Sequence, residues 1–137
     1  MPKPIIPTPD EVSKPFWDAV NEKRLIVQNC TVCNRLQYTP QRTCAQCSSA
    51  EHLEWRQTSG RGTIDANVVI HDSRLVAWQT EQPYNVAIIQ LAEDPTVKFF
   101  SNLPGVPADE VPVGAPVEVM FEEAAPGRLI HEWRIVR

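Results

Sequence analysis

Two C-x-x-C pairs constrain the fold of this chain more than any other feature. All four cysteines lie in the segment CTVCNRLQYTPQRTCAQC, residues 30–47, with ten residues between the two pairs. Two such turns that face each other bring four thiolates to one tetrahedral ion. The spacing therefore predicts a metal site with the ligands Cys30, Cys33, Cys44 and Cys47. Because four protein ligands leave no position for a substrate, the site is expected to be structural.

Zinc is the expected ion, although iron also accepts four thiolates, and the sequence does not separate the two. Free thiols or a pair of disulfides are the alternative, which a reducing compartment disfavours. Redox catalysis needs a thioredoxin-like βαβ unit, which the sequence does not predict. Glycine often follows the second cysteine of such turns, whereas Asn34 and Ser48 stand there in this chain. Asparagine tolerates the left-handed conformation, whereas serine is expected to be more strained in it.

The N-terminal segment predicts an extended arm followed by one short helix. Residues 1–9 hold four prolines, which favour extended backbone. A helix is expected over roughly 14–23, where Phe16 and Val20 share a face and Trp17 lies beside them. A helix of this length is not stable alone in water. We therefore expect it to pack on the rest of the chain or on a partner.

After a turn at 59–62, the pattern predicts β-structure throughout. Extended segments are expected at 63–71, at 75–79 as a hairpin return, and at 86–91, 97–101, 117–122 and 129–136. A small antiparallel barrel of about five strands, the OB-fold, fits this pattern and removes exposed strand edges. The fold class is thus mostly β, with an arm and helix over 1–24, a metal-binding ribbon over 25–59 and a barrel over 60–137.

Charge is unevenly distributed along the chain. Residues 21–61 carry six basic and three acidic side chains, net +3, whereas residues 62–137 carry five basic and eleven acidic ones, net −6. Binding along a phosphate backbone needs clustered Lys and Arg, so the acidic barrel argues against nucleic acid. A module that binds single-stranded nucleic acid is kept as the alternative function. The basic ribbon could still contact one anionic ligand.

Localisation and catalysis are constrained mainly by what is missing from the sequence. No apolar run is long enough to span a membrane, and the start MPKPIIPTPD has no apolar signal core; a cytoplasmic protein is expected. The three histidines, His52, His71 and His131, lie in no catalytic motif. Because no nucleophile or phosphate-binding loop is recognised either, the sequence favours a binding or accessory protein without catalytic residues of its own.

The order of these features resembles the zinc-ribbon/OB-fold proteins of domain-of-unknown-function family 35, the acyl-CoA-associated proteins. The resemblance covers roughly residues 12–136. It is carried by F-W at 16–17, K-R-L-I-V-Q at 23–28, C-T-V-C-N-R-L-Q-Y-T-P at 30–40, C-A-Q-C-S-S at 44–49, L-E-W at 53–55, S-G-R-G-T-I at 59–64, P-Y-N-V-A-I-I at 83–89 and V-G-A-P-V-E-V at 113–119. The segment Asp65–Asn67 departs from the family pattern, because other members often carry small hydroxylated residues at these positions.

The resemblance implies a rubredoxin-like zinc ribbon, with structural Zn²⁺ on the four cysteines, and a C-terminal OB-fold. Family members are non-catalytic partners of thiolase-like enzymes, and some are fused to or assembled with enoyl-CoA hydratase-like domains. The acyl transfer or C–C bond chemistry then belongs to the partner, and acyl-CoA is the implied ligand of the complex. On this reading, Phe16, Trp17 and Val20 would dock the partner. Arg24, Arg35 and Arg42 would contact the phosphates of CoA.

Overall fold

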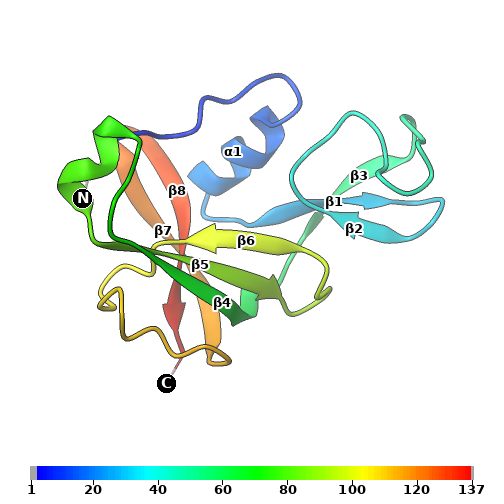
Figure 1. Ribbon diagram of the computed structural model, residues 1–137. Coiled ribbons are helices and arrows are strands. Elements are labelled where there is room, and N and C mark those ends of the chain that lie inside the picture. The colour runs from blue at the N-terminus through cyan, green and yellow to red at the C-terminus, as the bar shows by residue number, and fades with distance from the viewer. Residues whose placement is uncertain (1–2, 137) are drawn as a thin grey trace.

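The computed structural model describes residues 3–136 and consists of a short helix, a three-stranded sheet and a five-stranded sheet (Figure 1). Residues 1–2 of the predicted arm and residue 137 of the predicted barrel lie outside the described residues. Within 3–136, neither helix is long and apolar enough to cross a bilayer.

Helix α1 (Lys14–Asn21) confirms the predicted helix, although it ends two residues early. It follows a turn in which Asp10 Oδ1 accepts the backbone N–H groups of Val12 and Ser13 at 3.0 and 2.7 Å. The helix ends where Lys23 adopts φ 61°, and the N–H of Arg24 bonds back to the carbonyl of Ala19 at 2.9 Å. This bond satisfies a carbonyl that the end of the helix would otherwise leave unpaired.

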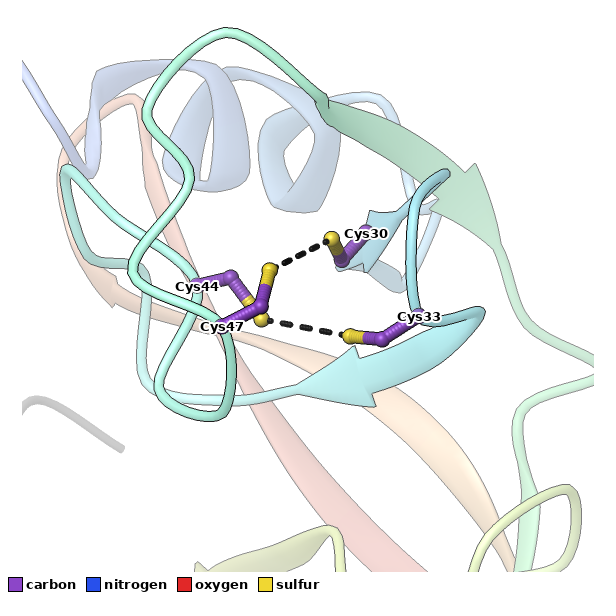
Figure 2. Close-up of side chains that lie close together, drawn as sticks. All are labelled: Cys30, Cys33, Cys44 and Cys47. Carbon is purple, nitrogen blue, oxygen red and sulfur yellow. Dashed lines mark hydrogen bonds between the residues drawn. The ribbon is translucent and has the colours of Figure 1, made fainter.

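The ribbon sheet has the order β2-β1-β3, and both pairings are antiparallel. Its strands are β1 (Ile26–Cys30), β2 (Arg35–Gln37) and β3 (Leu53–Gln57). All five residues of the central strand are buried. The loop between β2 and β3 carries the second cysteine pair and folds back over the end of this sheet (Figure 2).

The predicted OB-fold is confirmed as a five-stranded antiparallel sheet of order β6-β5-β4-β7-β8. Its strands are β4 (Arg61–Ile70), β5 (Tyr84–Leu91), β6 (Lys98–Ser101), β7 (Pro116–Ala125) and β8 (Arg128–Ile135). Burial alternates strictly along β5, so that every second side chain points into the core and the others point outward.

The hairpin return predicted at 75–79 is wrong, because that segment forms part of the 3₁₀ helix η1 (Val76–Glu81). Strands β4 and β5 already pair with each other as far as the register Ile70–Tyr84, so the segment 75–79 lies in the loop that joins them. The loop between β4 and β5 folds around buried Ser73 instead. Its hydroxyl accepts the N–H of Leu75 at 3.2 Å, and its N–H donates to Gln82 Oε1 at 2.8 Å.

Strands β6 and β8 close the barrel through side chains, and no ladder joins them among residues 3–136. Ser101 Oγ donates to Glu132 Oε2 at 2.7 Å and accepts the backbone N–H of Trp133 at 3.2 Å. The N–H of Asn102 also donates to Glu132 Oε2, at 3.0 Å. Burial raises the pKa of the Glu132 carboxyl, and these donors partly offset the effect.

Replacing Ser101 by alanine is expected to lower the free energy of unfolding by about 2 kcal/mol, because it leaves buried hydrogen-bonding groups of β8 without a partner. Urea unfolding followed by Trp fluorescence measures the loss. The exposed Ser59 offers a matched control, and its alanine variant should stay within about 0.5 kcal/mol of the unmodified protein. An equal loss in both variants would contradict the assigned role of Ser101.

One hydrophobic core joins the helix, the ribbon and the barrel. Phe16 of α1, Val27 of β1 and Leu36 of β2 belong to the same buried cluster as Phe99 of β6 and Trp133 of β8. The N–H of Thr58 also bonds to the carbonyl of Leu25 at 2.9 Å, where the ribbon leads into the barrel. The domain boundaries at 24/25 and 59/60 stay a prediction, but the side chains on either side of them pack together.

Candidate metal centre

The structure brings the four predicted cysteines together at one end of the ribbon sheet (Figure 2). Cys30 ends β1 and Cys33 lies in the turn to β2, whereas Cys44 and Cys47 lie in the loop that follows β2. All four Sγ atoms lie within 4.8 Å of one another. The Sγ atoms of Cys30 and Cys47 are 3.6 Å apart, and those of Cys33 and Cys44 are 3.5 Å apart.

These distances fit a tetrahedral four-thiolate ion. Bonds of about 2.3 Å from zinc to sulfur place the corners of a tetrahedron about 3.8 Å apart. The described residues need only small movements to reach this geometry, and the four-cysteine cluster is consistent with the metal site of a zinc ribbon. Soft thiolates and a closed sphere suit a structural ion and offer no open position for a substrate.

Backbone N–H groups favour the thiolate form of the first cysteine in each pair. The N–H of Cys33 donates to the Cys30 sulfur and lowers the pKa of that thiol. In the second pair, the N–H groups of Cys47 and Gln46 do the same for Cys44 and lower its pKa to about 6. Partial burial raises the pKa of Cys33 to about 12. A cation held by all four sulfurs would favour the thiolate of each.

Both residues that replace the expected glycines adopt the left-handed conformation, as the sequence predicts. Asn34 has φ 53° and Ser48 has φ 62°. The turn at Ser48 is closed by its N–H, which donates to the carbonyl of Cys44 at 2.9 Å. Serine has no special tolerance of this conformation, so the second turn carries more backbone strain than the first.

Replacing Ser48 by glycine is expected to raise the free energy of unfolding of the metal-loaded protein by about 0.5–1 kcal/mol, because glycine adopts φ 62° without steric strain. Thermal unfolding in excess zinc measures the gain. Ser48→Ala is the matched control, since it removes the hydroxyl but keeps the strain. A gain of equal size in the alanine variant would contradict the strain argument.

Two buried glutamines hold the loop that carries the second cysteine pair, and the sequence analysis missed them. Gln28 of β1 and Gln37 of β2 lie opposite each other, and their amides are joined at 2.8 Å. Gln28 Oε1 also accepts the N–H of Gln41 at 2.9 Å, and Gln37 Oε1 accepts the N–H of Ala45 at 2.9 Å. The sequence could have indicated their role, because each is a polar residue that directly follows an apolar residue in a short strand.

The residues predicted to dock a partner lie mostly inside this chain's own core. Phe16 and Val20 are both 0% exposed, so they offer no surface to another protein while the fold is intact. Trp17 is partly buried and stacks on the ring of His131, with centroids 5.8 Å apart. The apolar face of α1 therefore packs on the barrel and ribbon, and only Trp17 of the three keeps accessible surface.

The three arginines predicted to contact CoA phosphates do not form one cluster. Arg24 precedes β1, whereas Arg35 pairs with Cys30 at the other end of that strand. Each also has a polar partner already: Arg24 bonds to Glu22 at 3.3 Å and Arg35 to Gln46 at 3.2 Å, while Arg42 forms an ion pair with Glu11. A contact between these side chains and CoA stays a prediction. Such a contact would have to replace the present bonds to protein partners.

A half-buried imidazole with a fully enclosed Nδ1 atom is the second feature that sequence reasoning did not find. The ring of His131 in β8 contacts four aromatic rings, those of Phe16, Trp17, Tyr38 and Phe99. Its Nδ1 is enclosed without a hydrogen-bond partner among the described residues. Burial lowers the pKa of His131 to about 4, because the charged form has nothing to replace its hydration.

Comparisons with known proteins agree with this architecture. A family model described as the ChsH2 rubredoxin-like zinc ribbon domain matches residues 17–52, and one described as the ChsH2 C-terminal OB-fold domain matches residues 55–122. A curated relative from Thermomonospora curvata, named a probable enoyl-CoA hydratase alpha subunit, is 32% identical over 114 residues, which are 81% of this chain. The chain spans about a third (34%) of the length of that relative.

Two solved structures share the fold. One, described as an Ltp2-ChsH2(DUF35) aldolase, superposes with a TM-score of 0.80 at 27% identity, over 95% of this chain and 98% of the matched chain. The other is a protein of unknown function from the DUF35 family of Sulfolobus solfataricus. It gives a TM-score of 0.65 at 16% identity, over 92% of this chain and 86% of that one.

Proposed function

Because this chain belongs to the ChsH2/DUF35 family, which combines a rubredoxin-like zinc ribbon with an OB-fold, we propose that it is a non-catalytic accessory subunit of a thiolase-like acyl-CoA enzyme. The observation that carries this proposal is the near end-to-end match to one chain of an aldolase structure. The name of the curated relative supports an enoyl-CoA hydratase-like subunit as a further member of the complex. In this role the chain supplies a folded surface, and the partner supplies the reacting groups and most of the acyl-CoA site.

The chemistry of the described side chains supports an accessory role. The closed cysteine site has no position for a substrate. A serine–histidine contact does exist, between Ser49 Oγ and His52 Nδ1 at 2.7 Å, but it lies on an exposed loop. No carboxylate among the described residues is bonded to that imidazole, so the pair lacks the third group that orients a catalytic base.

We assign the four cysteines to one structural Zn²⁺ ion. When bound, the ion would cross-link the end of β1 to the loop after β2 and so fix the ribbon on which α1 and the barrel pack. Metal analysis of the purified protein tests this assignment, with one zinc per chain expected. Iron in its place, or no metal after purification in zinc-containing medium, would overturn it.

Co-expression with a thiolase-like enzyme encoded beside the gene tests the proposed function. The two proteins are expected to elute together in size exclusion. The enzyme should lose stability or acyl-CoA turnover when this chain is omitted. Size exclusion that leaves the two proteins in separate peaks would reject the proposal, as would acyl-CoA turnover by this chain alone.

A further inference from the structure

The outward face of strands β4, β5 and β6 is apolar where a solvent-exposed barrel face is expected to be polar. Outward-pointing residues lie opposite one another across the strands: Val68 faces Val86, and Ile88 faces Phe100. Val68 is 53% exposed and Phe100 is 61% exposed. Cross-strand apolar pairs that remain open to water form a contiguous surface, and such surfaces in soluble proteins mark interaction sites.

The loop between β4 and β5 extends this surface. Leu75 is 60% exposed and Val76 is 77% exposed. Leu75 lines a shallow hollow of about 270 Å³ together with Trp78, Val86 and Phe100. The loop forms the green coil at the end of the barrel remote from the ribbon strands β1–β3 (Figure 1). We call the surface made by Val68, Leu75, Val76, Val86 and Phe100 the barrel-face patch.

Hydrogen bonds hold the exposed loop in place before any partner binds. Buried Ser73 accepts the hydroxyl of Tyr84 at 3.2 Å through its own hydroxyl and the side-chain amide of Gln79 at 3.0 Å through its carbonyl. These bonds fix the loop in the conformation that leaves Leu75 and Val76 on the surface. A surface fixed in this way loses little conformational entropy on binding, which favours specific association.

The charges around the patch indicate what covers it. The one cation that points outward from β5 and β6, Lys98, already donates to Asp65 at 2.9 Å. Residues 62–137 carry eleven acidic and five basic side chains, so the barrel as a whole is acidic, and the exposed Arg74 beside Leu75 is the cation that the loop adds. Strands equivalent to β5 and β6 carry the nucleic-acid site in other OB-folds, but such a site needs cations between its aromatic rings. A protein surface with an apolar centre and a basic border fits instead.

We propose that the barrel-face patch is the surface on which the thiolase-like enzyme docks, through an apolar area bordered by basic side chains. This inference rests on the proposed function, and it replaces Phe16 and Val20 of α1, which are buried, with the outward face of the barrel. Phe100 and the partly exposed Trp17 line the same two hollows, so the patch adjoins α1 on one side. Phe100 of the edge strand β6 lines the hollow between the sheet and the loop together with Leu75 and Val86, which is the position expected of an apolar anchor.

The test measures the affinity of the co-expressed complex with the double variant Phe100→Thr, Val76→Thr. Threonine keeps β-propensity and removes the apolar contact, so the dissociation constant should rise at least tenfold, since central apolar anchors of an interface commonly contribute this much. Val113→Thr is the matched control, because Val113 is 60% exposed and lies outside the patch. The control is expected to bind like the unmodified protein, and thermal unfolding verifies that all variants are folded.

The outcomes separate this inference from the proposed function. If the unmodified protein forms no complex, the proposed function fails first. If it binds but the double variant binds equally well, or Val113→Thr weakens binding as much, the docking surface is wrong and the proposed function stands. Two further measurements test other occupants of the patch. Light scattering of the protein alone tests for a second copy of this chain, and calorimetry with octanoyl-CoA tests for the ligand. A dimer or a CoA affinity that the double variant abolishes would overturn the assignment to the enzyme.

Discussion

The variant Cys44→Ala is expected to lose its metal, unfold the ribbon and abolish binding of the partner enzyme. Three thiolates cannot close the tetrahedral sphere, and a structural zinc site supplies on the order of 10 kcal/mol of apparent free energy at neutral pH. The damage should extend beyond the ribbon, since Val27 and Leu36 belong to the same core as Phe16 and Trp133. Metal content, far-UV circular dichroism and size exclusion with the partner measure the three losses.

Ser49→Ala is the control for this prediction. Ser49 follows the second cysteine pair, and its side chain bonds only to the exposed His52, so its variant should keep one metal ion and full binding. A Cys44 variant that retained its metal and the partner would show that three sulfurs suffice. A folded Cys44 variant that altered the rate of a reaction catalysed by this chain alone would show that the site is catalytic rather than structural.

The second large effect is a loss of stability in acid that comes from His131. Its pKa is about 4 in the folded protein and about 6.5 in an unfolded chain. Between these values the unfolded state binds a proton that the folded state excludes, so the free energy of unfolding falls as the pH falls. The loss from this side chain should reach about 2 kcal/mol at pH 5 and about 3 kcal/mol at pH 4, whereas above pH 7 the side chain contributes no pH dependence.

The variant His131→Phe isolates this contribution, because phenylalanine fills the same space among the aromatic rings and carries no proton. Urea unfolding at pH 7.5 and pH 5.0 gives two differences, and the variant is expected to lose about 2 kcal/mol less than the unmodified protein on acidification. Subtraction removes the acid sensitivity of the cysteine site, which both proteins share. Parallel losses in the His131 variant and the unmodified protein would contradict the burial argument.

The sequence revealed those features that depend on short-range spacing. Three features follow from residues within a few positions of one another: the cysteine pairs, the left-handed positions at Asn34 and Ser48, and the helix that begins at Lys14. The barrel could be predicted because alternating apolar strands without intervening helices leave few other architectures. These features have in common that no knowledge of distant contacts is required.

The features that sequence reasoning missed depend on residues far apart in the chain. The enclosure of His131 is built by α1, the end of β2 and β6, and no local pattern indicates it. The apolar face of α1 could be recognised, but the pattern does not tell whether that face packs on this chain or on another. The run at 75–79 resembles a strand because Leu and Val favour extended backbone. It instead lies in the loop between the paired strands β4 and β5, where it forms most of η1.

The common core of ribbon, helix and barrel has a consequence for how a cell would assemble the complex. A newly made chain that has not captured its ion lacks the cross-link that seats β1 and β2 against Phe16 and the inner side of the barrel. If the proposed function holds, such a chain would lack the fixed ribbon behind the barrel-face patch, so metal delivery would precede recruitment of the enzyme. Metal supply would then limit assembly of the proposed complex.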